Sequence, residues 1–237
     1  PSTVRRTLEN ARCVVADAER HEDLETLVRA VPHRSEVLWA GSAGLALALG
    51  GVYPGPHSRT SPAAPAPVHK VLVVVGSLSR VSRRQLHSLA QEYGCVTAPV
   101  DDRSGAVEEA LAHARAALSG SACAAVHSTE NRNASDAGSF VGTLAEVVAC
   151  LSEEGLFDAL VLTGGETALG VARRLGAVGI RLEGEVEPGI PVGTLIGPSP
   201  YRVVTKAGGF GEPGSLVRVV EGLLGEGKER GPWTRHS

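Results

Sequence analysis

Small and hydroxyl-bearing residues gather in four short segments, each directly after an apolar stretch. The segments are Gly41–Gly44 (GSAG), Gly76–Ser79 (GSLS), Thr163–Thr167 (TGGET) and Lys206–Gly211 (KAGGFG). Glycine lets a backbone approach an anion closely, and a following helix directs free N–H groups at it. The hydroxyl groups and the Lys206 ammonium add further donors. One such loop is expected from tight turns alone, but four in one chain favour a ligand that carries phosphate groups.

Several familiar motifs are absent from the sequence. It contains no G-x-x-x-x-G-K-[ST] segment and no G-x-G-x-x-G after an expected strand, which excludes a P-loop protein and disfavours an NAD-binding one. Gly41–Gly44 is not G-x-S-x-G, so a hydrolase nucleophile elbow is not supported. The eight histidines and four cysteines lack metal-ligand spacing, and we expect no protein-held transition metal.

The elements that would position these loops alternate between strand and helix. Strands are expected at Cys13–Ala16, Glu36–Ala40, Val71–Val75, Val96–Val100, Ala122–Val126, Ala159–Thr163 and Tyr201–Lys206, with a β excursion over Ile180–Val186 and Pro191–Ile196. Helices are expected at Glu22–Ala30, Ala43–Leu49, Ser82–Tyr93, Ala106–Leu118, Ser139–Leu151, Thr167–Leu175 and Ser215–Leu224. This order predicts an α/β fold with a largely parallel sheet, whose ligands bind beyond the carboxyl ends of the strands.

One helix start carries a specific signal. Ser82 is followed three residues later by Gln85, which is the spacing of a capping box. The pattern predicts that the helix begins at Ser82, with both side chains satisfying first-turn N–H groups.

A proline-rich stretch divides the chain. Residues 53–67 contain five prolines and predict a semi-extended linker between residues 1–52 and an α/β domain at 68–230. The chain has 237 residues, 43% of them hydrophobic, and a net charge of −3, so it is globular in character and shows no electrostatic footprint for nucleic acid or membrane. No apolar run is long enough to span a membrane, and no signal peptide is visible.

The four cysteines lie far apart, and three of them (Cys13, Cys95 and Cys123) lie in or beside apolar runs. We therefore expect buried small hydrophobes in a reducing cytoplasm rather than disulfides. The sequence contains no methionine at all. Its absence leads us to expect a processed or excised piece of a longer protein.

Four segments together resemble a known family. Val73–Ser79 with Gln85, Leu162–Thr167, Glu187–Gly193 (EPGIPVG) and Lys206–Gly211 are similar to the C-terminal nucleotide-binding domain of the four-carbon acid sugar kinases, over about Val68 to Leu224. Ala16–Leu24 and Gly41–Ala46 resemble the end of that family's N-terminal, substrate-binding domain. The motifs occur in the family's order.

The resemblance implies ATP-dependent transfer of the γ-phosphoryl group to the terminal hydroxyl of a four-carbon acid such as threonate, erythronate or 3-oxo-tetronate, with Mg²⁺ neutralising charge. Carried over onto this sequence, ATP contacts are expected from Ser77, Ser79, Gly164, Gly165, Glu166, Thr167, Gly208 and Gly209, and a substrate contact from Ser42.

Three of these positions have a second interpretation. Glu166 could orient a Mg²⁺-bound water or simply favour the N-terminus of the helix that follows it. Lys206 could reach a phosphate or extend to solvent. Ser42 could hold a substrate or phosphate oxygen, or be a turn residue before a helix.

The chain departs from the family in one respect. The family's N-terminal Asp-Asp-x-Thr-Gly-Ala motif, which binds substrate, has no counterpart at the start of this chain. Asp101–Ala106 (DDRSGA) looks like it but lies inside the nucleotide domain, where helix capping explains an acidic pair and a serine. The catalytic residues are therefore unassigned, and the base and most of the acid-binding site are expected outside this chain.

Two other hypotheses stay open. One is a non-catalytic, nucleotide-binding subunit or fragment that needs a partner chain carrying the acidic motif. The other is a dehydrogenase-like dinucleotide domain, which the absent glycine fingerprint disfavours.

Overall fold

The structure is a computed structural model that describes residues 12–31, 37–53, 67–101, 105–129 and 137–225, the side chains of 137–139 excepted. The chain divides into two compact units, Pro1–Ala63 and Ala64–Ser237. Most of the expected linker, residues 54–66, lies outside the described residues.

The first unit contains two helices, α2 (His21–Ala30) and α3 (Ala43–Val52). Val28, Leu45 and Ala48 form its small core, and the Tyr53 hydroxyl donates to Val28 O at 3.1 Å. The strands expected at Cys13–Ala16 and Glu36–Ala40 are wrong, because residues 13–16 and 37–40 are not in strands; Glu36 itself lies outside the described residues. An apolar run becomes a strand only where a neighbouring strand supplies hydrogen bonds, and the described part of this unit has none to offer.

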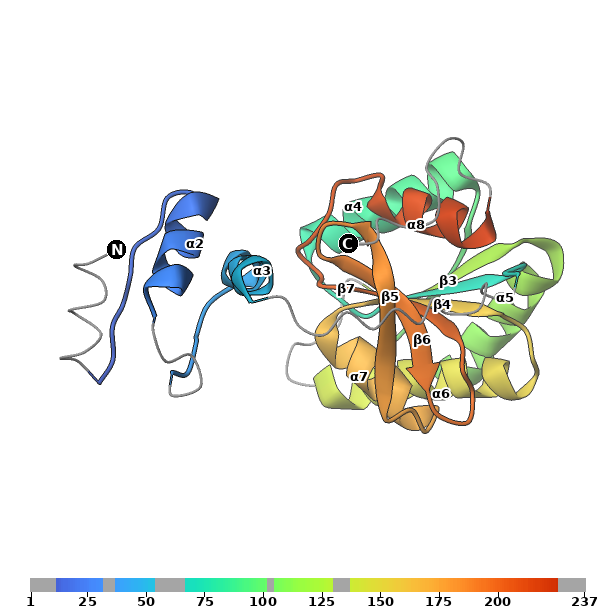
Figure 1. Ribbon diagram of the computed structural model, residues 1–237. Coiled ribbons are helices and arrows are strands. Elements are labelled where there is room, and N and C mark those ends of the chain that lie inside the picture. The colour runs from blue at the N-terminus through green and yellow to red at the C-terminus, as the bar shows by residue number, and fades with distance from the viewer. Residues whose placement is uncertain (1–11, 32–36, 54–66, 102–104, 130–136, 226–237) are drawn as a thin grey trace. The chain divides into compact units, whose positions relative to one another are not determined.

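The second unit is built on a seven-stranded sheet with the order β2-β3-β1-β4-β7-β6-β5. Figure 1 shows this sheet between two layers of helices. The strands are β1 (Val71–Val75), β2 (Val96–Val100), β3 (Cys123–Ser128), β4 (Ala159–Thr163), β5 (Gly179–Glu187), β6 (Ile190–Ile196) and β7 (Arg202–Lys206). Strands β2, β3, β1, β4 and β7 pair in parallel, and the β5–β6 hairpin joins β7 antiparallel. The expected α/β fold with a largely parallel sheet is confirmed.

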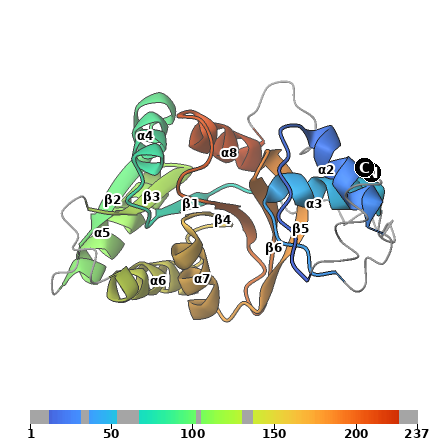
Figure 2. The same cartoon turned by 90° about the vertical axis from the view of Figure 1, so that its left-hand side faces the viewer.

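Helices cover both faces of the sheet. Their bounds are α4 (Arg80–Ser88, continued by the π-helical turn η2, Leu89–Tyr93), α5 (Ala106–Gly120), α6 (Ala137–Glu153), α7 (Gly165–Arg174) and α8 (Ser215–Leu224). Figure 2 shows α4 and α8 on one face and α5, α6 and α7 on the other. Val71, Val73 and Val75 face the first pair, whereas Leu72 and Val74 face the second group. Burial on both faces explains the unbroken apolar run of β1.

The chain connections diverge between β1 and both of its neighbours, because β3 leads into α6 and β4 leads into α7, on the face opposite to α4. Strand β1 leads into α4 on one face, and its neighbour β4 leads into α7 on the opposite face. Val75 and Thr163 are paired at the carboxyl ends of these two strands. Where adjacent connections diverge in this way, an α/β sheet leaves a crevice beyond its strand ends, and ligands bind there.

The expected start of α4 is wrong by two residues. The N-cap is Ser79, whose Oγ accepts from Val81 N at 3.2 Å, and the helix begins at Arg80. Ser82 and Gln85 therefore form no capping box, and both are fully buried. Ser79, which is nearer to the end of β1, caps the helix. The Ser82 and Gln85 side chains therefore form hydrogen bonds elsewhere within the unit.

Two of the three cysteines that lie in or beside apolar runs are buried as expected. Cys95 and Cys123 are buried, and Cys123 Sγ donates to Cys95 Sγ at 2.7 Å. Cys13 is exposed, since the strand that would have buried it does not form. All four thiols are free.

Candidate nucleotide-binding site

Three of the four glycine-bearing loops meet at one edge of the sheet. Gly76–Ser79 follows β1, Gly164–Thr167 follows β4, and Ala207–Gly211 follows β7, and these strands are neighbours in the parallel sheet. Gly164 N donates to Lys206 O at 2.9 Å, which joins the second loop to the end of β7. The loops lie at the crevice between β1 and β4.

The three loops touch so closely that a side chain at either of two glycines would overlap a neighbouring hydroxyl. A Cβ on Gly208 would lie 2.2 Å from Ser77 Oγ, and one on Gly76 would lie 2.1 Å from Thr167 Oγ1. A Cβ on Gly164 would lie 3.6 Å from Ser77 Cβ. The structure thus brings together Ser77, Gly164, Thr167 and Gly208, which belong to three different loops.

The expected ligand-binding residues divide by exposure. Gly165, Glu166 and Gly209 are exposed, and a Cβ on either glycine would meet no atom within 4 Å. Thr167 is buried against Gly76, where it sets the spacing of two loops. The open side of the site is therefore lined by glycine backbone and one carboxylate.

Ser77 and Ser79 are half-buried and bonded to their own loop. Ser77 Oγ accepts from Ser79 N at 3.2 Å, and Ser79 Oγ caps α4. Their hydroxyl hydrogens stay available to an anion.

Helix α7 begins at this edge. Its N-cap is Gly164, with φ +103°, and no side-chain hydrogen bond from that residue caps the first turn. First-turn N–H groups and the helix dipole favour an anion. Glu166 lies in that first turn, and both interpretations of it remain open.

Lys206 does not extend to solvent. Its side chain is buried, and Nζ donates to Ala207 O at 2.8 Å and to Phe210 O at 3.0 Å. Burial lowers the pKa of Lys206 from its ordinary value to about 8, because the charged form loses hydration. The solvent-exposed alternative is wrong: the polar turn after β7 folds back over the ammonium and supplies acceptors in place of water.

Two residues of α4 reach the same turn. Ser82 Oγ donates to Gly208 O at 2.7 Å, and Gln85 Nε2 donates to Phe210 O at 3.0 Å and to Glu212 O at 2.9 Å. The sequence pattern predicted a helix cap from these two residues and gave no indication of their hydrogen bonds to the turn after β7. The available signal was Gln85, which lies within the segments that resemble the family.

The Glu187–Gly193 segment supports this turn from the β5–β6 hairpin. Glu187 accepts from Ser215 Oγ at 2.6 Å and pairs with Arg218 of α8. Ser215 Oγ also accepts from Glu212 N at 2.8 Å. A Cβ on Gly189, which has φ +79°, would lie 2.9 Å from the Phe210 ring.

Ser42 lies in the first unit. It is the exposed N-cap of α3, and its side chain makes no capping hydrogen bond. Ser42 therefore precedes a helix, as one of its two interpretations expects, and its hydroxyl is accessible.

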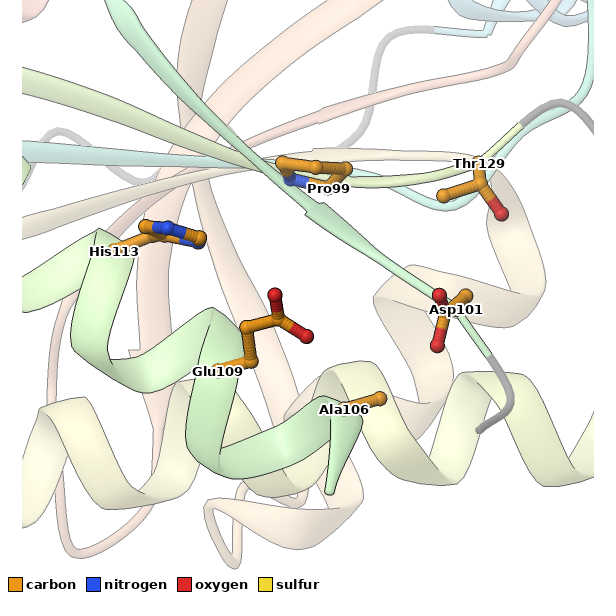
Figure 3. Close-up of a pocket in the computed structure, with 6 residues that line it drawn as sticks. All are labelled: Pro99, Asp101, Ala106, Glu109, His113 and Thr129. Carbon is orange, nitrogen blue, oxygen red and sulfur yellow. The ribbon is translucent and has the colours of Figure 1, made fainter. Parts of the chain in front are cut away.

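Asp101, from the segment that looks like the family's acidic motif, lines a separate pocket (Figure 3). The pocket has a volume of about 170 Å³, and Pro99, Asp101, Ala106, Glu109, His113 and Thr129 line it. Ligand sites for drug-sized molecules are roughly 300–1,000 Å³, so a nucleotide does not fit. The N-cap of α5 is Gly105, not an acidic residue or serine, and residues 102–104 lie outside the described residues.

Two features are absent from the described residues. Those residues contain no group of three or more histidine, cysteine, aspartate or glutamate side chains that could hold a metal ion. No helix among them has the length and apolar character needed to cross a bilayer.

The chain matches two family models. The nucleotide-binding C-terminal domain matches residues 72–216, and the sugar-binding N-terminal domain matches residues 2–49. A D-threonate kinase of Bordetella bronchiseptica is 36% identical over 232 residues, which cover 92% of this chain and 54% of that protein. A D-threonate kinase of Cupriavidus necator is 34% identical, over 91% of this chain and 54% of that protein. The chain thus spans about half the length of the curated relatives it matches.

Solved structures share the fold. A domain of unknown function from Bordetella bronchiseptica, crystallised with bound citrate as a domain-swapped dimer, is 33% identical with a TM-score of 0.60, over 94% of this chain and 56% of that one. A putative tRNA synthase from Salmonella typhimurium has a TM-score of 0.68 at 23% identity, over 92% of this chain and 54% of that one. The fold and the family match define the second unit as a nucleotide-binding domain. The chain belongs to the four-carbon acid sugar kinase family.

Proposed function

We propose that the second unit binds ATP as its Mg²⁺ complex and forms the nucleotide site of a kinase for four-carbon sugar acids. The observation that carries this proposal is the meeting of three glycine-bearing loops at the crevice between β1 and β4. Loops of this composition at such a crevice are suited to a polyphosphate, because backbone N–H groups and hydroxyls can approach its oxygens without steric hindrance.

The residues of the chain fit this ligand. The first turn of α7 would face a phosphate group, with the Ser77 hydroxyl beside it and the exposed backbone at Gly209 closing over it. Glu166 is a carboxylate on the open side of the loops, and Mg²⁺ commonly binds through one or two carboxylates together with substrate phosphates. Bound Mg²⁺ would supply neutralisation of the charge that develops on the transferred group.

Catalysis in this proposal consists of positioning and charge stabilisation. The loops orient the polyphosphate so that its terminal group faces the acceptor, and they exclude water from one side of it. The acceptor is the terminal hydroxyl of threonate, erythronate or 3-oxo-tetronate, and the names of the relatives support this substrate class. The free thiols of the chain agree with a cytoplasmic location.

Calorimetric titration of the chain with ATP–Mg²⁺, ADP and NAD⁺ tests nucleotide binding. We expect ATP and ADP to bind and NAD⁺ to fail. Absence of binding by every nucleotide would refute the proposal, and preference for NAD⁺ would favour a dinucleotide domain.

A second measurement separates catalysis from binding alone. ATP consumption is followed with threonate and with erythronate, for this chain and for the chain supplemented with a segment that carries the family's acidic motif. Turnover by this chain alone would exclude the alternative of a non-catalytic nucleotide-binding part, whereas turnover only after supplementation would support it.

A further inference from the structure

The backbone after β7 is held almost entirely through its carbonyl groups. Side-chain donors reach the carbonyl oxygens of Ala207, Gly208, Phe210 and Glu212. The Phe210 carbonyl accepts twice, from Lys206 Nζ and from Gln85 Nε2, at 3.0 Å each. We refer to residues 207–212 as the β7 turn.

The N–H groups of the β7 turn have fewer hydrogen-bond partners than its carbonyl groups. Phe210 N donates to Ala207 O, and Glu212 N donates to Ser215 Oγ. The N–H groups of Gly208 and Gly209 have no hydrogen-bond acceptor in the described part of the chain. Gly208 lies against Ser77, and Gly209 is exposed on the open side of the site.

The donors that hold the turn are unusual core residues. Ser82 and Gln85 have no exposed surface, and Lys206 is only 3% exposed. Within the described residues no carboxylate lies within ion-pair distance of Lys206. A buried positive charge without an anionic partner is costly unless an anion approaches it. The site therefore favours a negatively charged ligand next to the β7 turn.

We propose that Ser82, Gln85 and Lys206 are positioning residues that bind the carbonyl groups of the β7 turn and so direct the free N–H groups of Gly208 and Gly209 at the phosphate groups of the nucleotide. This inference rests on the proposed nucleotide site and assigns its phosphate-specific part. The three residues act through the backbone and do not touch the ligand in this assignment.

The test compares ligands with and without phosphate groups. Wild-type chain and Ser82→Ala are titrated calorimetrically with ATP–Mg²⁺, adenosine and inorganic tripolyphosphate. Loss of one hydrogen bond to Gly208 O is expected to raise the Kd for ATP and for tripolyphosphate roughly tenfold and to leave the Kd for adenosine unchanged. A merely structural role would weaken adenosine binding to the same extent.

Ser152→Ala is the matched control. Ser152 Oγ is hydrogen-bonded to the Tyr201 hydroxyl at 2.9 Å, and Tyr201 precedes β7, so the bond lies at the end of the sheet opposite to the loops. This variant loses one serine hydrogen bond, at a half-buried position where Ser82 is fully buried, and is expected to bind all three ligands as the wild type does.

Lys206→Met supplies a second, stronger perturbation. Loss of the buried charge and of two donors is expected to weaken tripolyphosphate binding by roughly a hundredfold, while thermal unfolding verifies that the variant is folded. Unchanged affinity of Ser82→Ala for ATP, or an equal loss for ATP and adenosine, would overturn the positioning role and leave the proposed nucleotide site intact. Failure of the wild type to bind either ATP or tripolyphosphate would overturn the proposed nucleotide site and this role with it.

Discussion

The contact between Gly208 and Ser77 makes a sharp prediction for Gly208→Ala. The new Cβ would lie 2.2 Å from Ser77 Oγ and 3.0 Å from Ser77 Cβ. Ordinary contacts of this kind begin at about 3.4 Å, so the hydroxyl must move by about 1 Å. Rotation of Ser77 would break the hydrogen bond that its Oγ accepts from Ser79 N at 3.2 Å.

The size of the effect follows from these two changes. Loss of the hydrogen bond costs roughly 1 kcal/mol, and the remaining overlap with Ser77 Cβ adds a cost of up to about 1 kcal/mol. We expect Gly208→Ala to lower the free energy of unfolding by about 1–2 kcal/mol and to weaken ATP binding at least tenfold, because both loops at the phosphate site shift.

Gly209→Ala is the matched control for stability. A Cβ there meets no atom within 4 Å and φ is not positive, so the free energy of unfolding should change by less than about 0.5 kcal/mol. Urea unfolding measures the stability of both variants, and calorimetric titration measures ATP affinity. The double variant Ser77→Ala/Gly208→Ala also lacks the hydrogen bond to Ser79 N and keeps the 3.0 Å contact between the two Cβ atoms, so it should be about as stable as Gly208→Ala. Equal stability of Gly208→Ala and Gly209→Ala would refute this reasoning.

Other predictions address the second loop, the buried lysine and the metal. Gly164→Ala should destabilise by about 1–3 kcal/mol, because φ is +103°. Gly165→Val should abolish ATP binding without unfolding the chain, since its side chain meets open space; retained affinity in calorimetry would contradict this. Burial lowers the pKa of Lys206 to about 8 from 10.5, so the folded chain releases that proton before the unfolded chain does. Wild-type stability relative to Lys206→Met should therefore rise between pH 8 and 10.5, by up to about 3 kcal/mol, and stay constant below pH 8; a difference that stays flat up to pH 10.5 in urea unfolding would be evidence against the buried charge. Removal of Mg²⁺ with EDTA should weaken ATP binding, measured by the same titration, and an unchanged Kd would exclude a metal contribution.

Much of the second unit could be predicted from sequence because its signals are local. The run Val71–Val75 is apolar and β-branched at every position, which only a strand covered on both faces accommodates. Strand ends followed by glycine and hydroxyl residues predicted a ligand site, and three of the four such segments meet at one edge of the sheet. The π-helical turn at Leu89–Tyr93 was not separable from the preceding helix, because both have nearly the same apolar spacing.

The first unit shows the limit of local patterns. Cys13–Ala16 has the composition of a strand, yet it is not one, because a strand depends on a partner that a short segment does not specify. Ser42 and α3 were predicted correctly as a residue before a helix, since helix hydrogen bonds close within four residues.

In the second unit, the sequence by itself determined the alternation of strands and helices, the largely parallel sheet and the glycine-bearing strand ends. Only the tertiary structure decided what Ser82, Gln85 and Lys206 do. Ser82 and Gly208 are 126 residues apart, and the spacing of Ser82 and Gln85 fits a helix cap as well as a pair of inward donors. The choice between those two arrangements depends on the packing of α4 beside the end of β7, because a donor is satisfied by whichever acceptor folding brings within reach.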